Sequence, residues 1–260
     1  MYLCTEPNCE KIRIYALIEV SIVSHGHGQM VDKLVCQVLQ FSNVSKIILT
    51  QNIPEYTEYA DNSRVRVIRN LHPKGFGHNH NRAASGVSSP FFCILNPDIE
   101  FKEDPFPMLL RSKRLTNSSV IAPMIINADR EIEDSVRYFP GFFSLIEKVM
   151  GINDGSYQVS GSNVPFAPDW IAGMFMLFDI ASFHEVGGFD EGFFLYYEDV
   201  DLCARLWKRR LKVAYDPSVS VIHNAQRSSR RNIRYMFWHA SSMMRYFIKH
   251  WGRLPNVGEI

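Results

Sequence analysis

The feature that most constrains the fold is a series of short apolar segments in the first hundred residues, separated by segments with helical spacing. Residues 12–23 are rich in β-branched side chains, and after residues 24–28 apolar side chains recur at every third or fourth position. Further predicted strands cover residues 46–50, 65–68 and 91–95, with a predicted helix over 79–87. Strands that are apolar on both faces and alternate with helices indicate an α/β fold, a mostly parallel sheet covered by helices.

The second half of the chain is more mixed. Strands are predicted over 120–126, 171–178, 212–215 and 219–223, and a helix over 200–210. Residues 129–168 are interrupted by glycine and proline, which predicts an irregular excursion over the surface. Long excursions of this kind often bind ligands.

A long amphipathic helix is predicted near the C-terminus. Its apolar side chains follow helical spacing over about five turns, and Gly252 is placed to end it. The apolar stripe comprises Ile233, Met236, Phe237, Ala240, Met243, Met244, Phe247, Ile248 and Trp251. The other face carries Arg230, Arg231, Arg234, Arg245 and Lys249. Two interpretations remain: the stripe packs on the domain, which is the commoner case, or the helix lies against anionic lipid.

Composition excludes several classes of protein. The chain has 260 residues, 46% of them hydrophobic, with 28 basic and 27 acidic side chains. This near-neutral balance argues against a chain that wraps nucleic acid, so no nucleic-acid partner is expected. Five scattered cysteines predict no disulfide framework. The N-terminus does not resemble a secretory signal and no apolar run reaches a membrane span, so we expect a cytoplasmic protein, with peripheral binding to the inner face of the plasma membrane left open.

Ligands of open parallel sheets bind beyond the carboxyl ends of the strands, so the segments that follow the strands are the candidate ligand sites. Residues 24–28 contain two glycines but lack the Gly-Lys-Ser/Thr of a Walker loop, and a plain turn is an equal alternative. Gly75 and Gly77 resemble the start of a dinucleotide fingerprint, but His80 occupies the third glycine position. Two His-x-His pairs lack the acid usual in a zinc hydrolase, so zinc is disfavoured.

Acidic residues follow two of the predicted elements. Asn96, Pro97 and Asp98 come directly after strand 91–95, where a carboxylate is well placed to hold a divalent cation against a diphosphate; a turn with a capping Asp is the alternative. Glu198 and Asp199 stand at the start of helix 200–210, after a dense run of aromatic residues. Acids are common at helix starts, but the aromatic run predicts a pocket wall around one of them. His223 ends the last strand and could complete a metal site, although a lone histidine is more often structural.

In this order the segments resemble the family-2 inverting glycosyltransferases of the GT-A fold, in particular their bacterial rhamnosyltransferase-like branch. The resemblance extends from Ile14 to about Trp251. Its most specific parts are Gly75-Phe76-Gly77 with Asn81, the sequence LNPDI at 95–99, and above all GGFDEGFFLYYEDVDLCARL at 187–206. It implies a single Rossmann-like GT-A domain over 1–260, with a nucleotide-sugar half (1–100), an acceptor and catalytic half (101–225) and a C-terminal helical segment (226–260).

The resemblance also implies a site. Asp199 matches the general base, and Asp98 and His223 match ligands of a divalent metal, Mg²⁺ or Mn²⁺. The residues expected at the donor are Ser24, Asn52, Gly75, Gly77, Asn81, Asn96 and Asp98. Those expected on the acceptor side are Gly173, Tyr197 and Glu198. The implied reaction moves a sugar, with dTDP-rhamnose as the favoured donor, to a saccharide or lipid-linked saccharide in cell-surface polysaccharide synthesis, with inversion by one in-line displacement.

Two departures and two alternatives accompany the resemblance. Asn96 replaces the first acid of the family's DxD pattern, and Gln51 stands where an Asp often contacts the nucleotide, which leaves the base open. A sugar nucleotidyltransferase is one alternative, but it would need basic residues in the first loop, which reads HGHGQM. A non-catalytic membrane-associated module of the same fold is the other.

Overall fold

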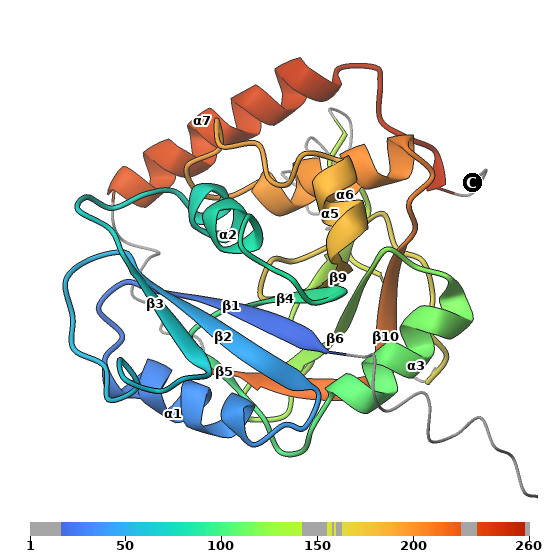
Figure 1. The fold of residues 1–260 in the computed structure, drawn as a ribbon. Coiled ribbons are helices and arrows are strands. Elements are labelled where there is room, and N and C mark those ends of the chain that lie inside the picture. Colours follow the sequence, from blue (N-terminus) through green and yellow to red (C-terminus); the bar gives the residue numbers. More distant parts are fainter. Residues whose placement is uncertain (1–16, 142–154, 158, 160–162, 225–232, 258–260) are drawn as a thin grey trace, which may run out of the picture.

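The computed structural model describes residues 17–141, 155–157, 159, 163–224 and 233–257. Its centre is an eight-stranded sheet with the order β3-β2-β1-β4-β9-β6-β10-β5 (Figure 1). Six strands run in one direction, and β9 and β5 run in the other. The predicted α/β fold with a mostly parallel sheet is confirmed.

Most strands and helices lie close to the segments predicted from the sequence, although no strand or helix was predicted over residues 99–100, 106–116, 136–137 or 180–185. The strands of the large sheet are β1 (Ile18–Ser24), β2 (Val44–Gln51), β3 (Val65–Arg69), β4 (Phe91–Leu95), β5 (Ile99–Glu100), β6 (Val120–Ile126), β9 (Phe175–Asp179) and β10 (Val213–His223). The helices are α1 (Gln29–Leu39), α2 (Phe76–Ala84), α3 (Phe106–Thr116), α5 (Ile180–Glu185), α6 (Glu198–Lys208) and α7 (Ile233–His250). A small second sheet pairs β7 (Val136–Arg137) with β8 (Trp170–Ile171).

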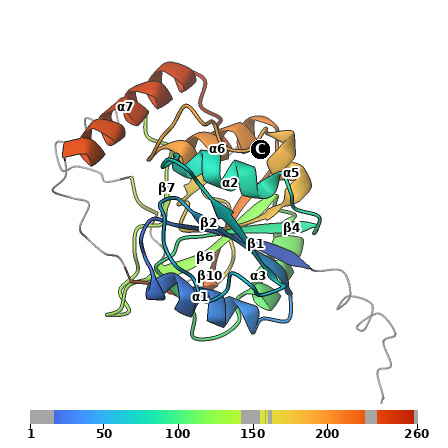
Figure 2. The same ribbon diagram turned by 60° about the vertical axis from the view of Figure 1, so that its left-hand side comes forward.

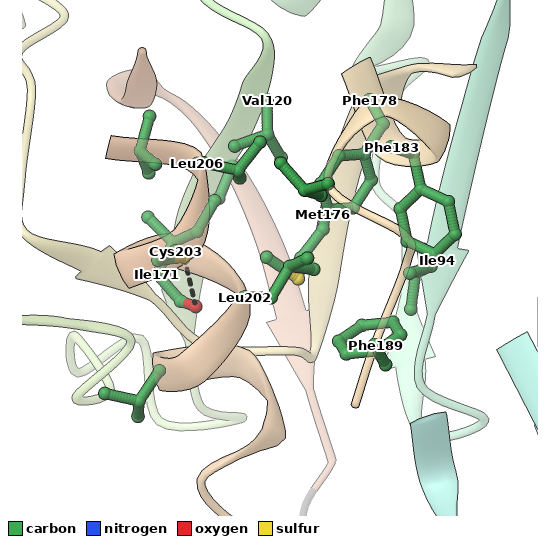
Figure 3. Packing of buried hydrophobic residues seen from close by; sticks show 14 of the residues in the cluster. Ile94, Val120, Ile171, Met176, Phe178, Phe183, Phe189, Leu202, Cys203 and Leu206 are labelled. Atoms are coloured by element: carbon green, nitrogen blue, oxygen red, sulfur yellow. Dashed lines mark hydrogen bonds between the residues drawn. The ribbon is translucent and has the colours of Figure 1, made fainter. Parts of the chain in front are cut away.

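Alternating side chains of the sheet form two hydrophobic layers. In β4, Cys93 and Leu95 pack toward α1 and α3, whereas Phe92 and Ile94 pack toward α2, α5 and α6. Figure 3 shows this second layer, where Met176 and Phe178 of β9 meet Phe183 of α5. Because both faces are covered, the central strands are long apolar runs, as the sequence pattern predicts.

The C-terminal helix α7 runs along the outside of the layer formed by α2, α5 and α6 (Figures 1 and 2). The interpretation that its apolar stripe packs on the domain is wrong for most of the stripe, because Ile233, Phe237 and Ile248 are 80%, 71% and 74% exposed, although Phe247 packs partly against the core. The side chains buried on α7 are Ser242, Tyr246 and His250. Within the described residues, no helix has both the length and the apolar content that a membrane crossing requires.

Three cysteines of the described chain, Cys36, Cys93 and Cys203, are free thiols, in agreement with the prediction for this part of the chain. Cys203 of α6 points into the core, where its thiol donates to the carbonyl of Ile171 at 4.0 Å (Figure 3). Burial raises the pKa of both Cys93 and Cys203, so these thiols are not reactive thiolates.

Candidate active site

The candidate residues gather where several parallel strands end. Ser24 at the end of β1 is paired in register with Gln51 at the end of β2, and Ile22 is paired with Leu95 of β4. The chain leaves β4 through Asn96 and Asp98, and the short strand β5 then pairs with the end of β10, placing Ile99 opposite His223. The carboxyl ends of β1, β2, β4 and β10 therefore share one edge of the sheet, the usual place for ligands in this architecture.

At this edge the imidazole of His223 lies between two carboxylates. Its Nε2 is 3.2 Å from Oδ2 of Asp98, and its Nδ1 is 2.6 Å from Oε2 of Glu133. Burial lowers the pKa of His223, but the hydrogen bonds and negative charges of Asp98 and Glu133 outweigh it and raise the pKa overall. Glu133 holds one ring nitrogen, which fixes the plane of the ring and turns the other nitrogen toward Asp98.

Asp98 and His223 could hold a divalent cation. Oδ1 of Asp98 is shielded from solvent and has no hydrogen-bond partner within the described residues. An anionic oxygen that is buried without a partner is costly unless something else binds it. No group of three or more His, Cys, Asp or Glu side chains suited to a metal occurs in the described part of the chain. The protein could thus supply one or two ligands, which suits a cation whose other ligands are phosphate oxygens and water.

Asp199 lies at the start of α6, and backbone amides hold its carboxylate on both sides. Oδ2 accepts from the amide of Gly173 at 2.9 Å, and Oδ1 accepts from the amide of Val200 at 2.8 Å. Burial raises the pKa of Asp199, and these backbone hydrogen bonds oppose the rise. The preceding residues, Tyr196 and Tyr197, adopt left-handed φ angles of 71° and 65°, a costly conformation outside glycine that is common at functional sites.

Glu198 is the buried neighbour of Asp199. It is 5% exposed, and its Oε2 has no hydrogen-bond partner in the described chain. Burial and the negative charge of Asp199 raise the pKa of Glu198 well above its ordinary value. Burial raises the pKa of both carboxyl groups, and the charge of Asp199 raises that of Glu198 further.

A short piece of backbone joins the two carboxylate regions. The amide of Asn96, two residues before Asp98, donates to the carbonyl of Met174 at 2.9 Å. Gly173, the residue before Met174, donates to Asp199. Asp98 and Asp199 are therefore connected through two consecutive residues between β8 and β9. A Cβ on Gly173 would approach the ring of Phe76 to 3.1 Å, so a small residue suits this position.

Several residues predicted to bind the donor also brace the surrounding loops. Asn81 donates to the carbonyl of Phe189 at 2.9 Å and accepts from its amide at 2.8 Å. A Cβ on Gly75 would lie 2.7 Å from the carbonyl oxygen of Phe194, and one on Gly77 would lie 2.6 Å from Cβ of Phe189. These three residues therefore hold the start of α2 against the loop that precedes α6.

Asn52 and Ser24 also have partners within the chain. Oδ1 of Asn52 accepts from the amide of Lys74 at 2.8 Å and from Nδ2 of Asn70 at 2.9 Å. Oγ of Ser24 accepts from the amide of His27 at 3.3 Å, which closes the loop after β1. By contrast, Gln51 is 2% exposed, and neither polar atom of its amide has a hydrogen-bond partner in the described residues. Gln51 is therefore the residue of this edge best suited to meet a polar ligand.

Glu133 was missed by the sequence analysis. It lies 90 positions before His223 in the chain, and no motif or spacing relates the two. Its amide donates to the carbonyl of Ile125 in β6 at 2.8 Å, which places the side chain beside β10.

A separate pocket of about 290 Å³, lined in part by Phe166, Trp207 and Lys212, opens near the start of β10, at the opposite end of that strand from His223.

The chain is 30% identical over 257 residues to the rhamnosyltransferase WbbL of Escherichia coli (strain K12), and the match covers 90% of this chain and 93% of that protein. The chain belongs to the family-2 glycosyltransferases of the GT-A fold, in their rhamnosyltransferase-like branch. A family model described as the N-terminal domain of galactosyltransferase also matches this glycosyltransferase over residues 156–229.

More distant relatives agree with the assignment. The glycosyltransferase is 29% identical over 157 residues to the N-acetylglucosaminyl-diphospho-decaprenol L-rhamnosyltransferase of Mycobacterium tuberculosis (strain ATCC 25618 / H37Rv), a match that covers 54% of this chain and 48% of that protein. It is 21% identical over 233 residues to the low-salt glycan biosynthesis hexosyltransferase Agl10 of Haloferax volcanii, covering 86% of this chain and 73% of that one.

Solved structures confirm the fold. GalNAc-T7, crystallised with UDP, GalNAc and Mn²⁺, superposes with a TM-score of 0.68 at 15% identity, over 90% of this chain and 48% of that chain. The mannosyltransferase PcManGT from Pyrobaculum calidifontis, in complex with GDP-Man and Mn²⁺, superposes with a TM-score of 0.61 at 10% identity, over 91% of this chain and 65% of that chain. Both neighbours are GT-A transferases that hold Mn²⁺.

Proposed function

We propose that this glycosyltransferase moves a sugar from a nucleotide donor to a saccharide or lipid-linked saccharide with inversion at the anomeric carbon, in cell-surface polysaccharide synthesis. The observation that carries the proposal is the joint placement of Asp98 and Asp199, which Asn96, Gly173 and Met174 connect through backbone hydrogen bonds. Asp98 lies at the edge of the sheet that would meet the diphosphate, and Asp199 lies at the start of the helix that would meet the acceptor.

Asp199 would act as the general base. Two backbone amides fix its carboxylate, and the start of α6 favours its ionised form. It would accept the proton of the acceptor hydroxyl as the new glycosidic bond forms, a contribution typically worth about 10² to 10⁴ in rate. A double displacement would need a second ionised carboxylate as nucleophile. Its neighbour Glu198 is buried and its pKa is raised well above the ordinary value, which disfavours a second ionised carboxylate and supports a single displacement with inversion.

Asp98 and His223 would hold a divalent cation, Mg²⁺ or Mn²⁺, when the donor is bound. The cation would offset the negative charge that develops on the departing nucleoside diphosphate. The unpartnered oxygen of Asp98 supports this assignment, and so does Glu133, which orients the imidazole from its far side.

We favour dTDP-rhamnose as the donor. The relatives whose names specify a rhamnosyl transfer support this choice. Gln51 gives it a chemical basis, because an amide offers one donor and one acceptor, a pattern complementary to the N–H and carbonyl of a thymine edge. The same edge occurs in uracil, so Gln51 alone does not separate the two bases.

A lipid-linked acceptor is the second part of the proposal. One relative's name contains N-acetylglucosaminyl-diphospho-decaprenol, a sugar carried on a lipid. We place the acceptor beside Asp199, on the side where β8 pairs with β7 and the amide of Ala172, next to Gly173, donates to the carbonyl of Ser135. Peripheral binding to an anionic membrane on the cytoplasmic side would give access to such an acceptor.

A thermal-shift screen of sugar nucleotides with and without Mn²⁺, followed by a transfer assay, tests the proposal. We expect dTDP-rhamnose to raise the melting temperature only when Mn²⁺ is present, because binding to the folded state stabilises it in proportion to the logarithm of ligand excess. The transferred sugar should have the anomeric configuration opposite to that of the donor. Retention of configuration would contradict the mechanism, and stabilisation by a different sugar nucleotide alone would contradict the donor.

A further inference from the structure

The orientation of α7 is the reverse of that expected for a helix packed on a core. Its apolar stripe faces outward, with Ile233, Phe237 and Ile248 among its most exposed side chains. The stripe continues through Met236 and Met244, and Trp251 just beyond the helix is 68% exposed. Exposed apolar side chains that gather along one face, rather than singly, mark a surface that binds something.

Polar contacts fix the helix in this orientation. His250 Nε2 lies 2.8 Å from Oδ1 of Asp201, which is buried in α6. Lys208 Nζ donates to the other imidazole nitrogen at 2.8 Å, and Ser242 Oγ donates to the carbonyl of Leu195 at 2.8 Å. Turning the helix to bury its stripe would break these contacts and leave Asp201 buried without them, which is costly. The outward stripe is therefore a stable feature of the fold.

The charge around the stripe identifies what it would meet. Residues 224–257 contain seven Arg and Lys side chains and no Asp or Glu, in a chain whose net charge is only +1. Asp190, from the loop before α6, pairs with Arg245 at 3.0 Å and with Lys249 at 2.7 Å. Lys249 also pairs with Asp201 at 2.7 Å, so two carboxylates face the seven cations of this sequence and its net charge remains positive. A helix of this kind suits the interface of an anionic bilayer, where apolar side chains enter the acyl boundary and cations meet the headgroups.

The inner face of α7 contacts the loop that leads to Asp199. The ring of Trp238 lies 4.6 Å from that of Phe194, and the ring of His239 lies 5.5 Å from that of Tyr197. Tyr197 immediately precedes Glu198 and Asp199. A surface bound to the outer face of α7 would thus lie one helix diameter, about 10 Å, from the acceptor side of the site.

We propose that the outer face of α7 binds the surface of an anionic membrane and so sets Asp199 close to headgroup level, where a lipid-linked acceptor presents its sugar. The membrane contact rests on the stripe and its charge, and only its purpose rests on the proposed function. A second copy of this chain is the other occupant that the stripe could accept, and the experiment below distinguishes the two.

Flotation with vesicles tests the membrane contact directly. The probes are vesicles of phosphatidylcholine alone and of phosphatidylcholine with phosphatidylglycerol. We expect the protein to float with the anionic vesicles, and Phe237→Glu with Ile248→Glu to weaken this binding at least about tenfold. Leu115→Glu is the matched control, because Leu115 is a leucine on α3 that is 74% exposed and lies across the sheet; it should bind as the parent does. Met236→Glu with Met244→Glu repeats the test should the first variant not fold.

Three outcomes overturn the inference. They are no flotation of the parent, equal flotation of the stripe variants, and a dimer by light scattering that the stripe variants dissociate without any vesicle binding. The same proteins are melted with dTDP-rhamnose and Mn²⁺. If the stripe binds vesicles but dTDP-rhamnose with Mn²⁺ does not raise the melting temperature, the membrane contact is supported and the proposed function is contradicted. Failure of the membrane contact and failure of the proposed function are therefore distinguishable.

Discussion

At the scale of single residues, two adjacent carboxyl groups receive different environments. Backbone amides surround Asp199, whereas Glu198 has one oxygen with no partner in the described chain. The Glu198-Asp199 motif predicts a carboxylate in the site, but the motif alone does not show which of the two acids ionises more readily. That difference depends on Gly173, which lies 26 positions away in the chain.

The pair supplies a matched test of the base. Asp199→Asn should lower kcat by about 10² to 10⁴, because the amide cannot accept the proton. Glu198→Gln should keep most of the activity, because burial and the charge of Asp199 favour the neutral form of Glu198, which glutamine resembles. Both variants should retain the parent's melting temperature in the presence of donor and Mn²⁺. Equal loss of kcat in both variants would remove the distinction between the two acids.

The pH dependence of the reaction follows from the same residue. Because burial raises the pKa of Asp199, the acid limb of the profile of kcat/KM against pH should lie above the ordinary aspartate pKa of about 3.9. The rate should rise as the pH increases through that pKa, since only the ionised form can accept a proton. Glu198→Gln should leave the limb in place. A rate that is flat down to about pH 4 would argue against Asp199 as the base.

Glu133 offers a test of positioning. Glu133→Gln should weaken the stabilisation of the protein by Mn²⁺ and donor, because the amide holds His223 less firmly; losses of about 10- to 100-fold in metal affinity are typical when such an orienting group is removed. Glu131→Gln is the control on the same segment, since Glu131 contacts Asn127 instead. The readout is the midpoint of a Mn²⁺ titration followed by melting temperature. An unchanged midpoint would exclude the positioning role.

At the scale of elements, the sequence predicts buried strands well and their interruptions poorly. β4 and β6 occupy the predicted residues 91–95 and 120–126, because strands covered on both faces are continuous apolar runs. The strand predicted over 171–178 is split into β8 and β9, because the amide of Gly173 bonds to a side chain instead of to a neighbouring strand. The two strands predicted over 212–223 are one, β10, with a shift in register between Asp216 and Ser220, where Pro217 has no N–H to donate.

The contact between α2 and the 189–194 loop explains why two glycines begin α2. Gly77→Ala should destabilise the fold by about 1–3 kcal/mol, because the new Cβ would lie 2.6 Å from Cβ of Phe189. Gly86→Ala is the control, since its Cβ would meet only the flexible end of Arg66. Denaturant unfolding of both variants measures the difference. Equal stability of the two variants would show that the loop yields to the added methyl group.

At the scale of the whole molecule, pattern alone could not decide how α7 is placed. Helical spacing predicts that the helix is amphipathic, but whether its apolar face is buried depends on the tertiary contacts of the helix. Here the contacts of His250 with Asp201 and of Ser242 with Leu195 hold the face with Ser242, Tyr246 and His250 inward. The same limit applies to the site: the strand ends were predictable, whereas the contact of His223 with Glu133 joins segments that share no local pattern.

The proposed mechanism depends on two carboxylates: Asp98, after the carboxyl end of β4, serves the donor, and Asp199, at the start of α6, serves the acceptor. Calorimetric titration of dTDP-rhamnose in the presence of Mn²⁺ into the parent, Asp98→Asn and Asp199→Asn measures the two roles separately. The predicted result is donor binding at parental affinity by Asp199→Asn and binding at least about tenfold weaker by Asp98→Asn, since the latter loses a charge from the cation site. Parental affinity in Asp98→Asn, or an equal loss in both variants, would contradict the account.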